Sequence, residues 1–235
     1  MRNIPNILTL CNLAAGCLAI VFISRDQAEW GLWAMFACVI FDFLDGAVAR
    51  GLRLDNRIGK ELDSLADVVS FGVVPGMIFF QLINDLVLGP DLQWLPYIGF
   101  LFTLAAAWRL ARYNIADPTQ GYFSGLPTPA ASVFAGGLYW LAMLPTCDSC
   151  GEAFLQPLGL LGGLAFISMA MISNIPMFDL KLEDRKWSGN QIRYISIIGG
   201  FGLFLWLREV GLIMTVVLYI FLSLLLYSLR PSKNR

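Results

Sequence analysis

The sequence predicts an all-α fold, a polytopic transmembrane helical bundle of six to eight spans that forms a single membrane domain over residues 1–235. Of these residues, 57% are hydrophobic and only 14% are charged, which lies outside the range of soluble domains. The apolar residues come in blocks of about 20, the length that an α-helix needs to cross ~30 Å of hydrocarbon. A membrane β-barrel would instead show alternating polar and apolar residues.

Eight apolar segments are candidate spans. They cover residues 5–24, 30–50, 62–84, 94–112, 126–145, 153–174, 191–207 and 209–229. The seventh segment is interrupted by glycines, and only Arg208 and Glu209 separate it from the eighth. We therefore expect six firm helices within a core of about 4–181, followed by a closing hairpin at about 191–229.

Lysine and arginine are distributed unevenly between the two ends of these helices. If the N-terminus lies inside, only Arg25 and Arg208 of the 16 cations fall on the outer side. Because positive charge stays on the cytoplasmic side, both termini are expected to face the cytoplasm. We expect a multi-pass protein of the cell (inner) membrane. The first helix is interpreted as a retained span, since one cation precedes it and no clear cleavage site follows.

The sequence contains five cysteines and no histidine. Without histidine, Ser-His-Asp triads and imidazole-centred metal sites are excluded, so carboxylates must carry any acid-base chemistry. Cys147 and Cys150 form a lone C-x2-C in an outer loop, for which both oxidation and no role at all remain open. The chain also lacks a G-x4-G-K-[ST] loop for a nucleoside triphosphate, and no nucleic acid partner is expected.

Four aspartates fall on two neighbouring predicted helices. They are Asp42, Asp45, Asp63 and Asp67. At 3.6 residues per turn each pair lies on one face of its helix, and the short 51–61 connection makes the two helices antiparallel neighbours. Carboxylates within spans are costly, and four that converge repel one another unless cations lie between them. Oxygen ligands without histidine or cysteine favour Mg²⁺ or Mn²⁺, and two divalent ions would balance four charges.

Ion pairing or cation transport could also account for aspartates in a span. The four could pair with the basic residues between 50 and 60, although four aspartates at helical spacing fit this less well than a single one would. A cation transporter also uses intramembrane carboxylates. However, these four are expected within ~10 Å of the cytoplasmic surface, whereas transporter sites tend to lie near the midplane.

The run from Asp42 to Asp67 fits D-x2-D-G-x2-A-R-x8-G-x3-D-x3-D at every fixed position, and so resembles the CDP-alcohol phosphotransferase family. The resemblance implies a bound CDP-lipid and attack by an alcohol hydroxyl on the β-phosphorus, with CMP as the leaving group. It further implies two metal ions held by Asp42, Asp45 and Asp63, with Asp67 sharing a metal and acting as the catalytic general base. A homodimer is also implied.

The same resemblance assigns a set of contacts to the CDP-lipid. These residues are Asn6, Thr9, Asn12, Gly46, Ala49, Arg50, Asn56 and Gly59. Gly46 and Ala49 leave a notch where a phosphorylated ligand can approach the helix backbone, and Arg50 can meet a phosphate. The polar residues of the first helix, in P-N-I-L-T-L-C-N, fit interhelical hydrogen bonding about equally well.

Further stretches resemble the membrane-integral bacterial phosphatidylserine synthases, a branch of this family. They are P-N-I-L-T-L-C-N-L-A-A-G-C, E-L-D-S-L-A-D-V-V-S-F-G-V-V-P-G, R-L-A-R-Y-N, F-S-G-L-P-T-P-A-A and M-I-S-N-I-P, which together cover most of 4–181. This branch implies CDP-diacylglycerol as donor and L-serine as acceptor, in phospholipid biosynthesis at the cytoplasmic face. The chain departs from the pattern after Asn174, where a tyrosine-containing turn is expected.

A zwitterionic amino acid needs a cation for its carboxylate. Arg109, Arg112 and Asn114 end a predicted helix on the same side as the aspartates, and are our candidates for binding serine. The two arginines fit positive-inside anchoring about as well. Glycerol phosphate, inositol phosphate or choline remains an alternative acceptor, and a non-enzymatic membrane cation carrier is the less favoured alternative.

Overall fold

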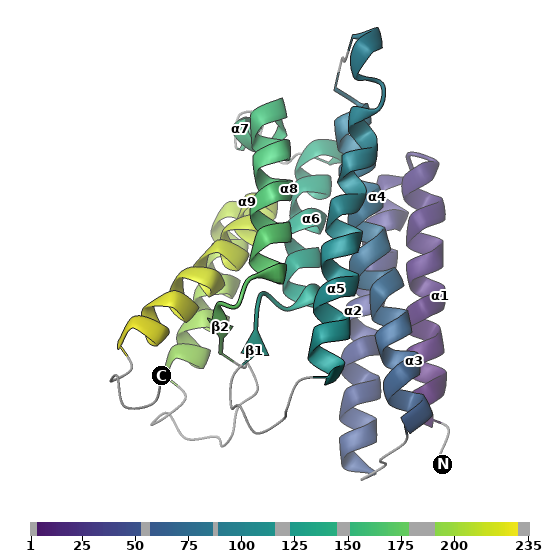
Figure 1. The fold of residues 1–235 in the computed structure, drawn as a ribbon, viewed down its shortest axis with the longest axis vertical. Coiled ribbons are helices and arrows are strands. Elements are labelled where there is room, and N and C mark those ends of the chain that lie inside the picture. Colours follow the sequence, from purple (N-terminus) through teal and green to yellow (C-terminus); the bar gives the residue numbers. More distant parts are fainter. Residues whose placement is uncertain are drawn as a thin grey trace.

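The computed structural model describes residues 4–52, 57–86, 89–115, 123–144, 151–178 and 191–229. In these ranges the chain forms a bundle of long helices that run side by side, with one two-stranded sheet at its lower edge (Figure 1). The all-α membrane fold is therefore confirmed. Within the described ranges, the segments long and apolar enough to cross a membrane are Ile4–Ser24, Ala28–Gly51, Ile58–Asn84, Pro90–Ile115 and Gln191–Tyr227.

The first three passes carry the predicted site. Helices α1 (Ile4–Ser24) and α2 (Ala28–Gly51) form a hairpin, and their turn contains Asp26 in a left-handed conformation with φ 56°. The third pass is one rod built from α3 (Arg57–Val68) and α4 (Val74–Asn84). Between these helices, Val69–Val73 forms a π-helical segment, η1, which was not predicted from the sequence.

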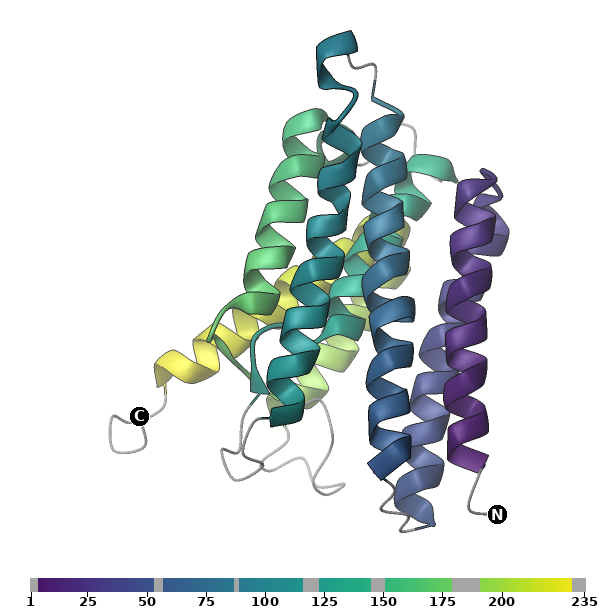
Figure 2. The same ribbon diagram turned by 45° about the vertical axis from the view of Figure 1, so that its right-hand side comes forward.

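The remaining elements complete the bundle, and the last of them ends at the lower end of the bundle as drawn (Figures 1 and 2). They are η2 (Pro90–Leu92), η3 (Leu95–Phe100), α5 (Leu101–Ile115), β1 (Phe123–Ser124), α6 (Thr128–Met143), α7 (Glu152–Leu155), α8 (Pro157–Ile172), β2 (Pro176–Met177) and α9 (Gln191–Leu229). Helix α1 begins, and α2 and α5 end, at this lower end, where α3 also begins.

The helix predicted at 153–174 is divided in the structure. A single turn, α7, is followed by Gln156 in an extended conformation (φ −65°, ψ 154°), and α8 starts at Pro157. The proline ring disfavours helical angles in the residue before it, which explains the break. Helices α6 and α8 have 16 residues each, so both are shorter than the spans predicted for them.

The α9 segment reverses direction at Arg208, whose φ of 50° and ψ of −118° are not helical. Its two halves pack against each other. The Thr215 hydroxyl donates to the Gly200 carbonyl at 3.2 Å, and a Cβ on Gly211 would lie 2.2 Å from the Leu203 carbonyl oxygen. The reversal falls at the predicted boundary between the seventh and eighth spans.

The core lies between α4, α5, α6 and α8. Phe79 and Phe102 are fully buried there, with ring centroids 5.9 Å apart. By contrast, large apolar side chains are exposed around the outside of the bundle, among them Trp33, Leu158 and Trp206. Exposed apolar surface on this scale is typical of a protein that faces lipid.

A tight corner joins the lower ends of α6 and α8. Strands β1 and β2 pair antiparallel, and the next residue, Gly125, donates its N–H to the Ile175 carbonyl at 2.9 Å. Gly125 has φ +81°, and a Cβ at this position would lie 2.3 Å from the Met171 carbonyl oxygen. Both the backbone angle and the close approach require glycine.

Replacing Gly125 with alanine is therefore expected to cost about 2 kcal/mol or more, because the left-handed conformation and the collision with a backbone oxygen add. The melting temperature in detergent should fall by about 5 °C or more. Gly162→Ala is the matched control, since a Cβ there meets nothing within 4 Å inside α8. Equal melting temperatures for the two variants would contradict this account of the corner.

Candidate active site

Three carboxylates from α2 and α3 converge within the bundle. Asp42, Asp63 and Asp67 each place one carboxylate oxygen within 4.8 Å of the other two. All three side chains are partly buried, and the Oδ1 atoms of Asp63 and Asp67 lack a hydrogen-bond partner in the described part of the chain. Carboxylates this close to one another and partly buried away from water repel one another strongly unless a cation lies between them. An oxygen-only ligand set fits a hard divalent cation such as Mg²⁺ or Mn²⁺.

The fourth predicted ligand, Asp45, lies one turn further along α2 and is turned toward α1. It is buried, and Oδ2 accepts a hydrogen bond from the Thr9 hydroxyl at 2.7 Å. Asp45 still repels the carboxylates of Asp63 and Asp67 electrostatically. The structure thus places three of the four aspartates in one group and the fourth beside it, fixed by a residue predicted to contact the nucleotide.

Asn12 lies one turn deeper than Thr9 on α1. Its backbone carbonyl accepts hydrogen bonds from Ser70 Oγ at 3.1 Å and from Cys38 Sγ at 3.7 Å, which fastens α1 to η1 and α2. Its side-chain amide is fully buried, and neither polar atom has a partner among the residues described. A buried amide with unused donors and acceptors is suited to receive a ligand.

A profile of the family described as CDP-alcohol phosphatidyltransferase matches residues 2–176, about three quarters of the chain. This chain belongs to the CDP-alcohol phosphatidyltransferase family. The match includes all four aspartates and both helices that carry them. The family resemblance predicted from the aspartate motif is confirmed.

Individual CDP-alcohol phosphatidyltransferases are also similar. The CDP-diacylglycerol–serine O-phosphatidyltransferase of Helicobacter pylori (strain J99) is 34% identical over 188 residues, which cover 78% of this chain and 74% of that protein. The protein of the same name from Mycobacterium bovis is 33% identical over 186 residues, 75% of this chain and 61% of that protein. The archaetidylserine synthase of Methanothermobacter thermautotrophicus is 35% identical over 139 residues, 58% of this chain and 57% of that protein. The chain thus spans about three fifths of the length of the mycobacterial and archaeal relatives.

The motif positions of the CDP-alcohol phosphatidyltransferase family lie near the lower ends of α2 and α3. Gly46 and Ala49 are partly buried on α2, and Arg50 is exposed in its last turn. A Cβ on Gly46 would lie 3.1 Å from Nη1 of Arg50, so the absence of a side chain leaves room for the guanidinium. Gly59 is partly buried in the first turn of α3, and Asn6 is partly buried near the start of α1. Asn56, like the Cys147 and Cys150 pair, lies outside the described residues.

Arg109, the first predicted serine-binding residue, faces the acidic group from α5. It is 8% exposed, and its Nε has no hydrogen-bond partner within the described ranges. Its guanidinium carbon lies 5.3 Å from the centre of the Tyr113 ring and is attracted electrostatically to Asp67. This arrangement leaves a buried cation with an unused donor close to the predicted general base.

The other two predicted serine-binding residues are bonded to the protein itself. Arg112 donates to the Ile172 carbonyl at 2.6 Å and to Asn174 Oδ1 at 2.5 Å, so it links α5 to the end of α8. The Asn114 amide donates to the Ser64 hydroxyl at 2.8 Å, next to Asp63 in the chain. These hydrogen-bond partners were not predicted from the sequence. The sequence did show a departure from the phosphatidylserine synthase pattern directly after Asn174.

Proposed function

We propose that this protein transfers the phosphatidyl group of CDP-diacylglycerol to the hydroxyl of L-serine, giving phosphatidylserine and CMP for phospholipid biosynthesis. The observation that carries the proposal is the convergence of Asp42, Asp63 and Asp67, in a chain of the CDP-alcohol phosphatidyltransferase family. Serine as the acceptor is supported by the names of the relatives, which all refer to serine or to a serine lipid.

In the proposed reaction Asp67 is the general base. Its Oδ1 has no partner in the described structure, and it lies among the carboxylates that would hold metal. Asp67 accepts the proton of the serine hydroxyl while the hydroxyl oxygen bonds to the β-phosphorus and the bond to the CMP oxygen breaks. Two divalent ions held by Asp42, Asp45, Asp63 and Asp67 would neutralise the diphosphate and the charge on the departing CMP.

Arg109 is the residue we propose to bind the serine carboxylate. It is buried close to Asp67, and its Nε is unused among the residues described. Arg112 and Asn114 are less suited to this role, because their hydrogen bonds hold them toward the end of α8 and toward Ser64, whereas Arg109 is attracted to Asp67 itself. A guanidinium near the general base would hold the amino acid with its hydroxyl toward Asp67.

On the donor side, we propose that the CDP group lies along α1 and the lower half of α2. The partly buried or buried polar residues there, and the notch at Gly46, support this placement. The proposed contacts are Asn6, Thr9, Asn12, Gly46, Ala49, Arg50, Asn56 and Gly59. The asymmetric placement of lysine and arginine supports an active site that faces the cytoplasm from the inner membrane, in a homodimer as the family resemblance implies.

One assay tests the reaction and its metal requirement. Purified protein in detergent is given CDP-diacylglycerol, radiolabelled serine and Mn²⁺, and CMP release and labelled lipid are measured. We expect serine-dependent release that falls to background with excess EDTA and returns with added Mn²⁺ or Mg²⁺. CMP release only with glycerol phosphate, inositol phosphate or choline would change the acceptor, and none with any alcohol would favour a cation carrier. A CDP-activated ether lipid in parallel tests the archaetidylserine-like alternative.

Thr9→Val is expected to raise the KM for CDP-diacylglycerol about tenfold. The substitution keeps the shape of the side chain but removes the hydroxyl that donates to the buried Asp45 carboxylate, and such a loss costs about 1–3 kcal/mol. Thr9→Ser, which retains the hydroxyl, is the control and should stay within about threefold of the wild-type value. Equal kinetics for the valine and serine variants would show that this hydrogen bond does not matter.

A further inference from the structure

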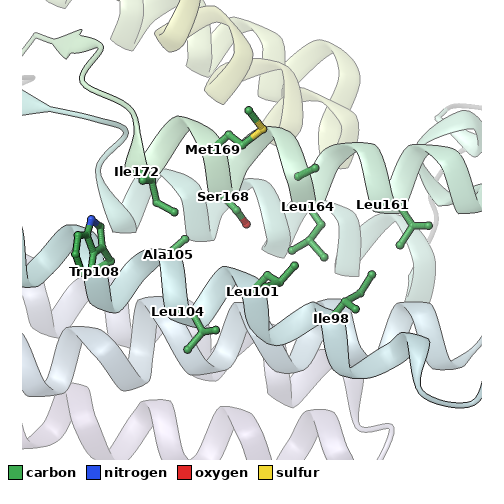
Figure 3. A pocket seen from close by; sticks show the side chains of 11 residues that line it. Ile98, Leu101, Leu104, Ala105, Trp108, Leu161, Leu164, Ser168, Met169 and Ile172 are labelled. Carbon is green, nitrogen blue, oxygen red and sulfur yellow. The ribbon is translucent and has the colours of Figure 1, made fainter.

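An apolar groove lies between α5 and α8 (Figure 3), and none of the residues that line it belongs to the acidic group. Its volume is about 520 Å³. Large side chains form its walls, with Leu104 and Trp108 on α5 and Met169 on α8 at least 60% exposed. Ala105 and Ser168 are buried at its floor, and these small residues create the depression.

The groove has the length of one leaflet. It extends from Ile98 on η3 to Trp108 on α5, and from Leu161 to Ile172 on α8. At about 1.5 Å per residue, the ten and eleven steps between these end residues correspond to about 15 Å, half of the ~30 Å hydrocarbon thickness. Since both helices belong to a membrane bundle, hydrocarbon chains are the surrounding solvent. A single acyl chain running along the helices matches this length.

The end of the groove nearest the acidic side of the bundle is cationic. Arg112 follows Trp108 by four residues on the same face of α5. It donates to the carbonyl of Ile172, the last groove residue of α8. The guanidinium therefore lies where a lipid phosphate would be if the acyl chain occupied the groove, and Trp108 lies where tryptophans favour the membrane interface.

Ser168 is an unexplained polar group in this apolar groove. It is 8% exposed, and its hydroxyl has no hydrogen-bond partner in the described ranges, not even the preceding turn of its own helix. Ser168 lies one helical turn, about 6 Å, further into the membrane than Ile172. A hydroxyl at this depth, below a cation and above an apolar trough, can donate to a glycerolipid ester carbonyl.

We propose that the α5–α8 groove binds one anionic glycerophospholipid of the bilayer, with its phosphate at Arg112, an ester carbonyl at Ser168 and an acyl chain along the floor. A transmembrane helix from a second copy could cover the same walls, and the oligomeric state measured below separates that occupant from a lipid. The lipid is distinct from the donor substrate. The acidic group is on α2 and α3, and Arg109, which faces it, is not among the groove residues.

Fluorescence quenching tests the site without serine or metal, so its outcome is independent of the proposed reaction. Delipidated protein in a non-quenching detergent is titrated with dibrominated phosphatidylglycerol or dibrominated phosphatidylcholine. The Trp108 signal is the difference between wild type and Trp108→Phe. We expect saturation at about one phosphatidylglycerol per chain, with affinity about tenfold higher than for phosphatidylcholine. Ser168→Ala should weaken phosphatidylglycerol binding several-fold, and Ser168→Leu, which fills the floor, should abolish it.

Ala14→Leu, on the exposed face of α1, is the matched control and should bind as the wild type does. Melting temperatures show whether each variant folds, and Ser168→Ala keeps the test valid if Ser168→Leu does not. The proposal is overturned if both lipids quench equally and Ser168→Ala has no effect. It is also overturned if equimolar CDP-diacylglycerol displaces phosphatidylglycerol, or if Ser168→Leu changes only the oligomeric state and not lipid binding.

Discussion

Replacing Asp67 with asparagine is expected to lower kcat for serine-dependent CMP release by about 10³-fold or more. An amide cannot accept the hydroxyl proton, and a positioned general base contributes about 10²–10⁴-fold to rate. Loss of a negative charge beside Asp42 and Asp63 adds to the effect, because these groups would share metal. Binding of labelled CDP-diacylglycerol should largely survive, since an asparagine oxygen keeps the size and one ligand atom of the carboxylate.

The matched control is Asp91→Asn. Asp91 is an exposed aspartate on η2, outside the acidic group, so this variant should retain the wild-type rate. Initial rates at saturating serine and equilibrium binding of labelled donor separate the two effects. A near-normal rate for Asp67→Asn would show that another group takes the proton.

Arg109→Gln is expected to raise the KM for serine by about 30- to 100-fold, with a smaller change in kcat. A charge-assisted hydrogen bond to a carboxylate is worth about 2–3 kcal/mol when it forms away from water. Arg109→Lys, which keeps the charge but not the planar fork, should recover part of this affinity. Ethanolamine, which lacks the carboxylate, gives a second measurement. The wild type should prefer serine strongly over ethanolamine, and Arg109→Gln should lose most of that preference.

Arg112→Gln serves as the comparison for Arg109. Because Arg112 is bonded to Ile172 and Asn174, its replacement should lower the melting temperature more than it changes the KM for serine. The opposite result, with serine affinity dependent on Arg112 and not on Arg109, would reverse our assignment of the acceptor-binding residue.

Helical periodicity was enough to bring Asp63 and Asp67 together, since residues four apart share a face whatever surrounds the helix. It could not determine the orientation of Asp45. That orientation depends on Thr9, which is 36 positions earlier in the chain and meets Asp45 only because α1 and α2 pack as a hairpin. The same limit applies to Arg112, whose partners are 60 and 62 residues away.

Local sequence signals account for the helix break and the chain reversal, but not for the π-helix. The break before Pro157 could have been predicted, because a proline restricts the residue that precedes it. The reversal at Arg208 was predicted from a charged pair between apolar segments. By contrast, Val69–Val73 carries no recognised sequence signal for a π-helix, and its apolar residues fit an α-helix equally well.

The π-helical segment fixes how the two halves of the third pass are rotated about their common axis. A π-helical turn accommodates one residue more than an α-helical turn, which changes the phase of everything beyond it by about 100°. Asp63 and Asp67 precede this offset, and the fully buried Ile78 and Phe79 follow it. Each half of the pass can then contact its own neighbours. The carboxylates of the first half and the aromatic ring of the second half point in different directions. Shortening this segment by one residue would straighten the rod and turn one set of side chains away from its partners. The number of residues in this segment therefore sets the relative rotation of the two halves.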